Sequence, residues 1–135
     1  MHVHTGDNAV PPITGTELGG VLDDLEGIHA GIDLIRDGLR LLALDRHDLN
    51  DTQVLLATLA GSPDGTDVLG AVGQLVARLA NPDSNPALRT LPLDAQKTAR
   101  RHGELTAYHL GDPDLRDSAS NANAALDTPE RRNQP

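Results

Sequence analysis

The chain has 135 residues, the length of one domain, with a formal net charge of −9 and no Cys, Phe or Trp. The missing cysteine excludes a disulfide framework, and the acidic balance argues against a protein that wraps nucleic acid. Because aliphatic and alanine side chains must form almost the whole core, we expect helices packed on helices rather than a sheet sandwich.

The charge is distributed unevenly along the chain. Residues 1–88 carry 13 acidic side chains against 4 arginines, whereas residues 89–135 carry seven of each sign. No basic segment followed by an apolar stretch opens the chain, and no apolar run approaches the length of a membrane span. These patterns predict a cytoplasmic protein without a membrane-spanning helix.

Residues 1–13 have no periodicity and contain two prolines, so we expect an irregular N-terminal arm. Within it, His2, His4 and Thr5 resemble the His-x-His segment that opens the metal site of polymerase-and-histidinol-phosphatase-type hydrolases. That resemblance implies a barrel with several further His and Asp clusters, which an all-α chain of this length does not provide. We therefore predict no metal site and no cofactor.

The strongest periodic signal begins after Thr14 and Glu17, which have the spacing of a capping box. Apolar residues then recur at alternating spacings of 3 and 4, the pattern of a coiled-coil seam. It predicts one long helix over residues 16–46, roughly 45 Å in length, around which the shorter helices fold. The apolar positions are Leu18, Val21, Leu25, Ile28, Ile32, Ile35, Leu39 and Leu42.

Four glycines of this predicted helix, Gly20, Gly27, Gly31 and Gly38, fall on one line of its surface. Small residues in a line allow a second helix to approach closely, by analogy with helix packing in membranes. The alternative is that compositional drift placed glycine on a face exposed to solvent. Gly19 lies off the line, and we expect it to tolerate alanine.

Shorter helices follow, bounded by Gly and Pro and by capping residues such as Asp112. Three prolines mark the segment before Asp94 as a loop. The predicted helices cover residues 50–59, 67–80, 94–110 and 112–126, within a single domain over 14–126 that a polar tail at 127–135 follows.

Lys97, Arg100 and Arg101 form a basic patch on the predicted helix 94–110. Such a patch suits the phosphates of DNA, as in a recognition helix, or the acidic first half of the same chain or of a partner subunit. His102 and His109 lie seven residues apart on the same helix. Because zinc takes three or four ligands, this pair alone predicts no metal site.

The sequence shows no nucleophile motif and no phosphate-binding glycine loop, so we do not expect an enzyme. We predict a non-catalytic assembly or adaptor module that self-associates as a homodimer or binds another protein. The alternative is a small DNA-binding regulator that uses the helix 94–110. The residues predicted for self-association are Leu18, Leu25, Gly27, Ile28, Gly31, Ile32, Ile35, Gly38, Leu39 and Leu42.

Overall fold

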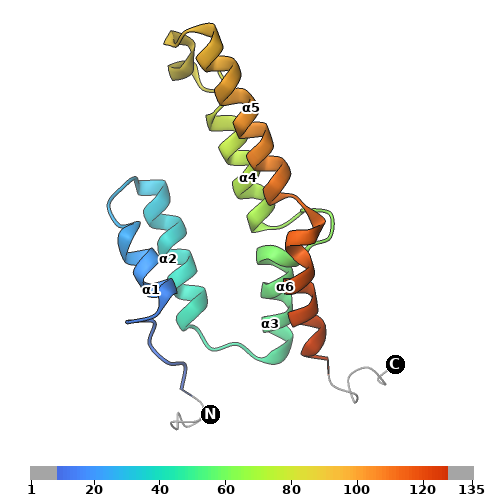
Figure 1. The fold of residues 1–135 in the computed structure, drawn as a ribbon. Coiled ribbons are helices and arrows are strands. Elements are labelled where there is room, and N and C mark those ends of the chain that lie inside the picture. The colour runs from blue at the N-terminus through green and yellow to red at the C-terminus, as the bar shows by residue number, and fades with distance from the viewer. Residues whose placement is uncertain (1–8, 128–135) are drawn as a thin grey trace. The chain divides into compact units, whose positions relative to one another are not determined.

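The computed structural model describes residues 9–127, and within them it contains six α-helices and no strand (Figure 1). The predicted all-α fold class is confirmed. The chain divides into an N-terminal unit that ends at His47 and a C-terminal unit that begins at Asp48. The predicted single domain over residues 14–126 spans both units and stays a prediction. None of the helices described combines the length and the apolar content that crossing a bilayer requires.

The N-terminal unit consists of α1 (Glu17–Asp24) and α2 (Ala30–Leu44), which lie side by side (Figure 1). Thr16, and not Thr14 of the expected capping box, is the N-cap of α1: its hydroxyl accepts a hydrogen bond from the Gly19 N–H at 3.1 Å. Arg36 of α2 donates from Nε to the Leu22 carbonyl of α1 at 2.8 Å. Leu22 is the one fully buried aliphatic side chain among the described residues, so this unit has a small core.

The predicted long helix over residues 16–46 is wrong, because the chain leaves the helical conformation between α1 and α2. Gly27 has a φ of +79°, a left-handed conformation that residues with a Cβ rarely adopt. Its N–H donates to Asp33 Oδ1 at 2.9 Å, and His29 Nδ1 caps α2 by accepting from the Gly31 N–H at 2.8 Å. The apolar residues keep their alternating spacing of 3 and 4 on both sides of this turn, so the pattern gives no sign that the helix is interrupted.

The four glycines consequently do not form one continuous helical line, because Gly27 lies in the connection. A Cβ added at Gly20 or Gly38 would meet nothing within 4 Å in the structure. Gly19 behaves in the opposite way: it is buried, and a Cβ there would collide with the carbonyl oxygen of Ile13. The expectation that Gly19 tolerates alanine is wrong.

The C-terminal unit contains two pairs of helices, α3 with α6 and α4 with α5, that follow one another along the unit (Figure 1). A turn of π-helix, η1, continues α3 and also contacts α4 and α6. The predicted shorter helices are present at close to their expected positions. The elements are α3 (Leu49–Leu56), η1 (Ala57–Gly61), α4 (Val68–Leu79), the 3-10 helix η2 (Pro86–Thr90), α5 (Leu93–Leu110) and α6 (Pro113–Ala125).

The backbones of α4 and α5 approach each other closely at two glycines. A Cβ on Gly73 of α4 would lie 3.0 Å from Leu110 Cβ and 3.1 Å from Ala107 Cα. A Cβ on Gly103 of α5 would lie only 2.7 Å from Ala80 Cβ. Close helix packing through small residues therefore occurs in this protein, but in the α4–α5 pair rather than in the segment where the sequence analysis placed it.

Because α4 contacts α5 through its small residues, its larger aliphatic side chains form a separate stripe at spacings of 4, 3 and 4. All four of these side chains are exposed in the structure. The C-terminal unit thus leaves aliphatic surface in contact with water. The stripe consists of Val68, Val72, Leu75 and Leu79.

Candidate functional site

The candidate site is a surface of α2 that we call the outer face, formed by Leu34, Ile35, Gly38 and Leu41. The side chains of Leu34, Ile35 and Leu41 are 74%, 48% and 67% exposed. Residues three and four apart lie next to one another on a helix, so Gly38 lies between the Leu34–Leu41 row and Ile35. With no side chain at Gly38 and nothing within 4 Å of its missing Cβ, the centre of the face is open to another helix.

A surface groove of about 430 Å³ borders the outer face at the C-terminal end of α2. Arg40 in this groove donates to Asp23 Oδ1 of α1 over 3.3 Å, and its buried Nε finds no acceptor among the described residues. The hydrogen-bonding capacity of the Arg40 guanidinium is therefore not saturated by the residues that the structure describes. The lining residues are Asp37, Arg40, Leu41, Leu44 and Asp45.

The residues predicted for self-association are divided by the break before α2. Leu18 lies on α1, Leu25, Gly27 and Ile28 lie in the connection, and Gly31, Ile32, Ile35, Gly38, Leu39 and Leu42 lie on α2. Ile32 and Leu39 are half-buried, whereas Ile35 and Gly38 are exposed. Leu34 and Leu41 are the most exposed aliphatic side chains of α2 but were not among the predicted residues, because they lie outside the 3 and 4 series.

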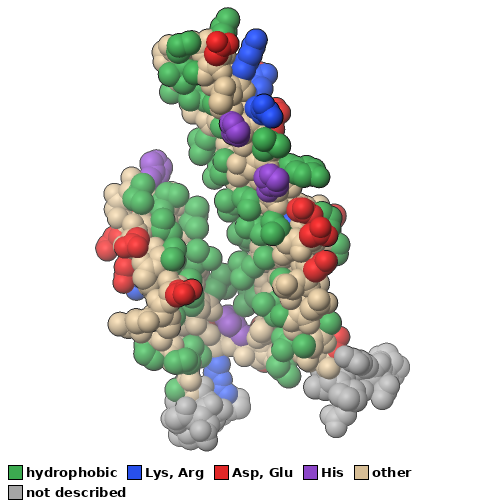
Figure 2. All heavy atoms as spheres, viewed as in Figure 1, with side chains coloured by type: hydrophobic (Ala, Val, Ile, Leu, Met, Phe, Trp, Pro, Cys, Tyr) green, Lys and Arg blue, Asp and Glu red, His purple; other side chains and the backbone are tan. Residues whose placement is uncertain are grey.

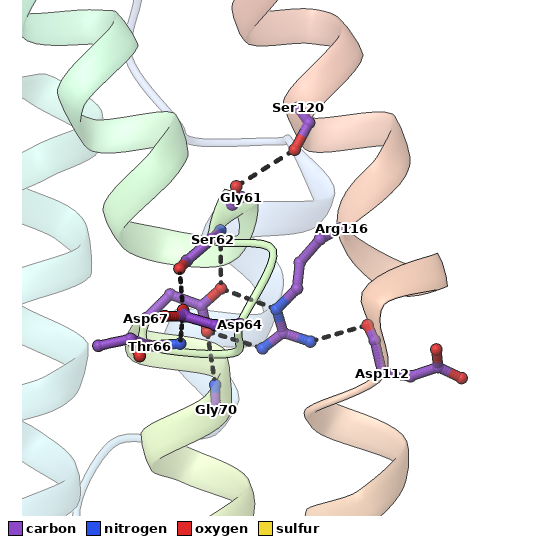
Figure 3. A network of polar contacts seen from close by, with 9 residues as sticks. All are labelled: Gly61, Ser62, Asp64, Thr66, Asp67, Gly70, Asp112, Arg116 and Ser120. Atoms are coloured by element: carbon purple, nitrogen blue, oxygen red, sulfur yellow. Dashed lines mark hydrogen bonds and ion pairs between the residues drawn. The ribbon is translucent and has the colours of Figure 1, made fainter.

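A buried ion pair in the C-terminal unit is a second polar feature, which sequence reasoning missed (Figure 3). Arg116 of α6 donates from Nε and Nη2 to the two carboxylate oxygens of Asp67 at 2.9 and 2.7 Å, and the exposed fractions of the two side chains are 1% and 0%. Arg116 Nη1 donates to the Asp112 carbonyl at 3.0 Å, and the Asp67 carboxylate also accepts from the N–H groups of Gly70 and Ser62. Each charged group is thus surrounded by partners from the chain itself, as expected of a pair that holds the fold together.

The C-terminal unit has two arms, one formed by α3, η1 and α4 and the other by α5 and α6. The ion pair lies where each arm is interrupted, between η1 and α4 in the first and between α5 and α6 in the second (Figure 3). Asp67 is the N-cap of α4, and Asp112 is the N-cap of α6. The hydroxyl of Ser120 on α6 donates to the Gly61 carbonyl of η1 at 3.2 Å. We call this cluster the polar junction; its residues are Gly61, Ser62, Asp64, Thr66, Asp67, Gly70, Asp112, Arg116 and Ser120. It fixes α6 to the end of η1 and to the start of α4.

Two carboxyl groups of the polar junction are stronger acids than usual. Hydrogen bonds from the Ser62 hydroxyl and the Thr66 N–H lower the pKa of Asp64 from 3.8 to about 2. The hydrogen bonds from Arg116 lower the pKa of Asp67 as well, against the opposing effect of its burial. Both hydrogen-bond sets stabilise the ionised carboxylate.

We expect acid to destabilise the C-terminal unit through these two groups. A carboxyl group whose pKa is lowered by folding stabilises the protein above its unfolded pKa, and this stabilisation is lost as the pH falls through the folded pKa. The melting temperature should therefore fall as the pH is lowered from 5 towards 2, and it should fall less steeply in D67N. The measurement is thermal melting by circular dichroism at several pH values. D117N, on the exposed side of α6, is the matched control and should show the same dependence of melting temperature on pH as the unchanged protein. The same dependence in D67N would contradict the expectation.

The predicted basic patch lies near the start of α5, where Figure 2 shows Lys and Arg side chains gathered at one end of the α4–α5 pair. Arg100 forms an ion pair with Asp83 at 2.9 Å, which offsets part of the charge of the patch. Lys97 and Arg101 are exposed. Phosphate binding by these three residues stays a prediction.

The His102–His109 pair gains no further ligand within the part of the chain that the structure describes. His102 and His109 are exposed on α5, and the His109 ring lies edge-on to the Tyr108 ring at 5.7 Å. Among residues 9–127, no three His, Asp or Glu side chains come together in a group that could hold a metal ion. His2 and His4 lie outside the described residues.

The chain matches no protein-family model, no curated protein and no solved structure. The geometry of its own residues is therefore the basis for a proposal about its function.

Proposed function

We propose that the protein is a non-catalytic assembly module that self-associates through the outer face of α2. The observation that carries the proposal is the exposure of Leu34 and Leu41, at 74% and 67%, on either side of the Gly38 level of the helix. Grouped exposed aliphatic side chains mark binding surfaces, because water is released when they are covered. Covering them with a second helix would bury apolar surface at a place where Gly38 permits close approach.

The small core of the chain supports the same proposal. Leu22 is the one aliphatic side chain that is fully buried within residues 9–127, although burial of such side chains is the main driving force of folding. The stripe on α4 from Val68 to Leu79 is a further exposed apolar surface. Association between chains adds the buried apolar surface that each chain lacks by itself.

The proposal is non-catalytic because the most developed polar cluster, the polar junction, serves the fold. Its Arg116 guanidinium is bonded by Asp67 and by the Asp112 carbonyl, and its Asp67 carboxylate is bonded on both oxygens. A catalytic acid, base or nucleophile needs an atom that can approach a substrate. These buried charges are engaged with each other instead.

We expect L34E and L41E to prevent self-association without unfolding the chain. Each places a carboxylate in the surface that dimer formation would remove from water, which is costly for an unpaired charge. The dissociation constant should rise by about 100-fold, equivalent to about 3 kcal/mol. The measurement is light scattering over a concentration series, with circular dichroism to confirm that the helices are retained.

Leu93 at the start of α5 provides the matched control, because its side chain is 71% exposed and belongs to the other unit. L93E should associate as the unchanged protein does. A chain that stays monomeric at every concentration would refute self-association, and a dimer unaffected by L34E and L41E would place the contact elsewhere. The DNA-binding alternative predicts a salt-dependent complex with duplex DNA that is lost when Lys97, Arg100 and Arg101 are replaced together by Ala.

A further inference from the structure

We infer that His29 makes the start of α2 sensitive to pH, because the cap that it provides exists only while its imidazole is neutral. His29 is the N-cap of α2, and its Nδ1 accepts a hydrogen bond from the Gly31 N–H at 2.8 Å. The inference concerns a conformational device within the N-terminal unit. It goes beyond the proposed function and holds whether or not the chain self-associates.

The hydrogen bond at Nδ1 fixes the protonation state of the ring. A neutral imidazole carries a proton on one nitrogen and a lone pair on the other, whereas both nitrogens of the charged form are donors. An acceptor at Nδ1 therefore requires the neutral ring with its proton on Nε2. Gly31 leaves space for this arrangement, since a Cβ there would lie 3.2 Å from His29 Nδ1.

Protonation of the ring removes the cap and then opposes the helix. The added proton on Nδ1 would point at the Gly31 N–H, so that two donors face each other and the hydrogen bond is lost. The positive charge would lie at the N-terminus of α2, where the helix dipole disfavours a cation. His29 is exposed, so the ring can take up the proton from water. Histidine is the side chain that ordinarily changes its charge between about pH 8 and pH 5.

None of the charged groups of the N-terminal unit forms an ion pair with His29 in the described part of the chain. The Asp33 carboxylate accepts from the Gly27 N–H at 2.9 Å, and Glu26 contacts Arg36 at 3.9 Å. Protonation of His29 therefore strengthens no ion pair that is already present in this unit, and it breaks the cap. The charged groups are Glu17, Asp23 and Asp24 of α1, Glu26 of the connection, Asp33, Arg36, Asp37 and Arg40 of α2, and Asp45 and Arg46 after it.

His47, the other histidine that the structure describes in this unit, responds differently. It follows α2, and its Nε2 donates to the Leu42 carbonyl at 2.8 Å. Because this nitrogen also carries a proton in the charged ring, the hydrogen bond is retained on protonation. A cation at the C-terminal end of a helix is favourable as well. A fall in pH therefore weakens the start of α2 and not its end.

Amide hydrogen exchange measured by NMR tests the inference at a single residue. The protection factor of the Gly31 amide, corrected for the effect of pH on intrinsic exchange, is compared at pH 8 and pH 5. We expect it to fall about fivefold at pH 5, the factor that corresponds to the loss of one helix cap. H29N should keep its protection at both pH values, because asparagine caps a helix and does not titrate. H29A should show the low value at both.

H47Q is the matched control, because it removes the second histidine of the unit while glutamine keeps a donor. The Gly31 amide of H47Q should respond to pH as it does in the unchanged protein. Equal protection of this amide at pH 8 and pH 5 in the unchanged protein would overturn the inference. A fall in H29N, or the loss of the response in H47Q, would overturn it as well, because the response would then belong to another group.

Discussion

R116M is expected to lower the melting temperature of the C-terminal unit by about 10 °C or more, because removal of one partner from a buried ion pair leaves the other uncompensated. Arg116 supplies both hydrogen bonds to the outer edge of the Asp67 carboxylate, and neither side chain is exposed to water that could replace them. Methionine has a similar length but no donor. The measurement is thermal unfolding by circular dichroism at neutral pH.

The exposed Arg101 of α5 gives the matched control, and R101M should melt within about 2 °C of the unchanged protein, as surface substitutions usually do. Should R116M melt at the same temperature as R101M, the polar junction would not hold the unit together. D67N is a second variant: it preserves the shape of the helix cap but removes the charge, and we expect it to be destabilised in the same direction.

G103A is expected to reduce the free energy of unfolding by about 1–3 kcal/mol through overpacking. The added Cβ would lie 2.7 Å from Ala80 Cβ and 3.2 Å from Ala77 Cα, and neither atom can move without the α4 backbone. Helix propensity alone would stabilise the same substitution by about 0.5–1 kcal/mol. The sign of the change therefore shows which effect dominates. Urea unfolding measures it.

G20A in α1 is the control for this experiment, because a Cβ at Gly20 meets nothing within 4 Å. It should raise the stability by about 0.5–1 kcal/mol through propensity. G73A should resemble G103A, since its Cβ would press on Ala107 Cα from the other side of the contact. Stabilisation by G103A and G73A would mean that the α4–α5 contact adjusts without cost.

The parts of the fold that the sequence predicted are those determined by local chemistry. Asp112 and Pro113 begin α6 as expected, and Gly111 ends α5, because caps and helix breakers act on their own neighbours. The turn at Gly27 escaped prediction because the apolar spacing continues through it. A glycine that is exposed in a helix and one that needs a positive φ are identical as letters in a sequence.

The candidate site and the polar junction depend on contacts between residues far apart in the chain, and such contacts are harder to predict from the sequence. Asp67 and Arg116 are 49 residues apart, and no periodicity relates them. The exposure of Leu34 and Leu41 depends on which side of α2 faces α1, which Arg36 and Leu22 decide through a tertiary hydrogen bond. The sequence does contain one signal of a tertiary contact. Small residues recur at every fourth position along α5, and they mark the side of α5 that contacts α4.

Small residues also occur at spacings of 3, 4 and 3 in α4. The two series together predict a closely packed pair of helices, a stronger signal than glycines on one helix alone. The series are Ala99, Gly103 and Ala107 of α5 with its C-cap Gly111, and Gly70, Gly73 and Ala77 of α4 with its C-cap Ala80.

The interruption of both arms at the polar junction makes the length of the α4–α5 pair independent of the rest of the C-terminal unit. Seven residues added to each of these helices would extend the pair by about 10.5 Å and return every later side chain to within about 20° of its former direction. The hydrogen bonds of Asp67, Asp112 and Arg116 would be untouched, because they lie below the insertion. The α4–α5 hairpin can therefore become longer or shorter by whole heptads, while the polar junction and the α3–α6 pair keep their structure.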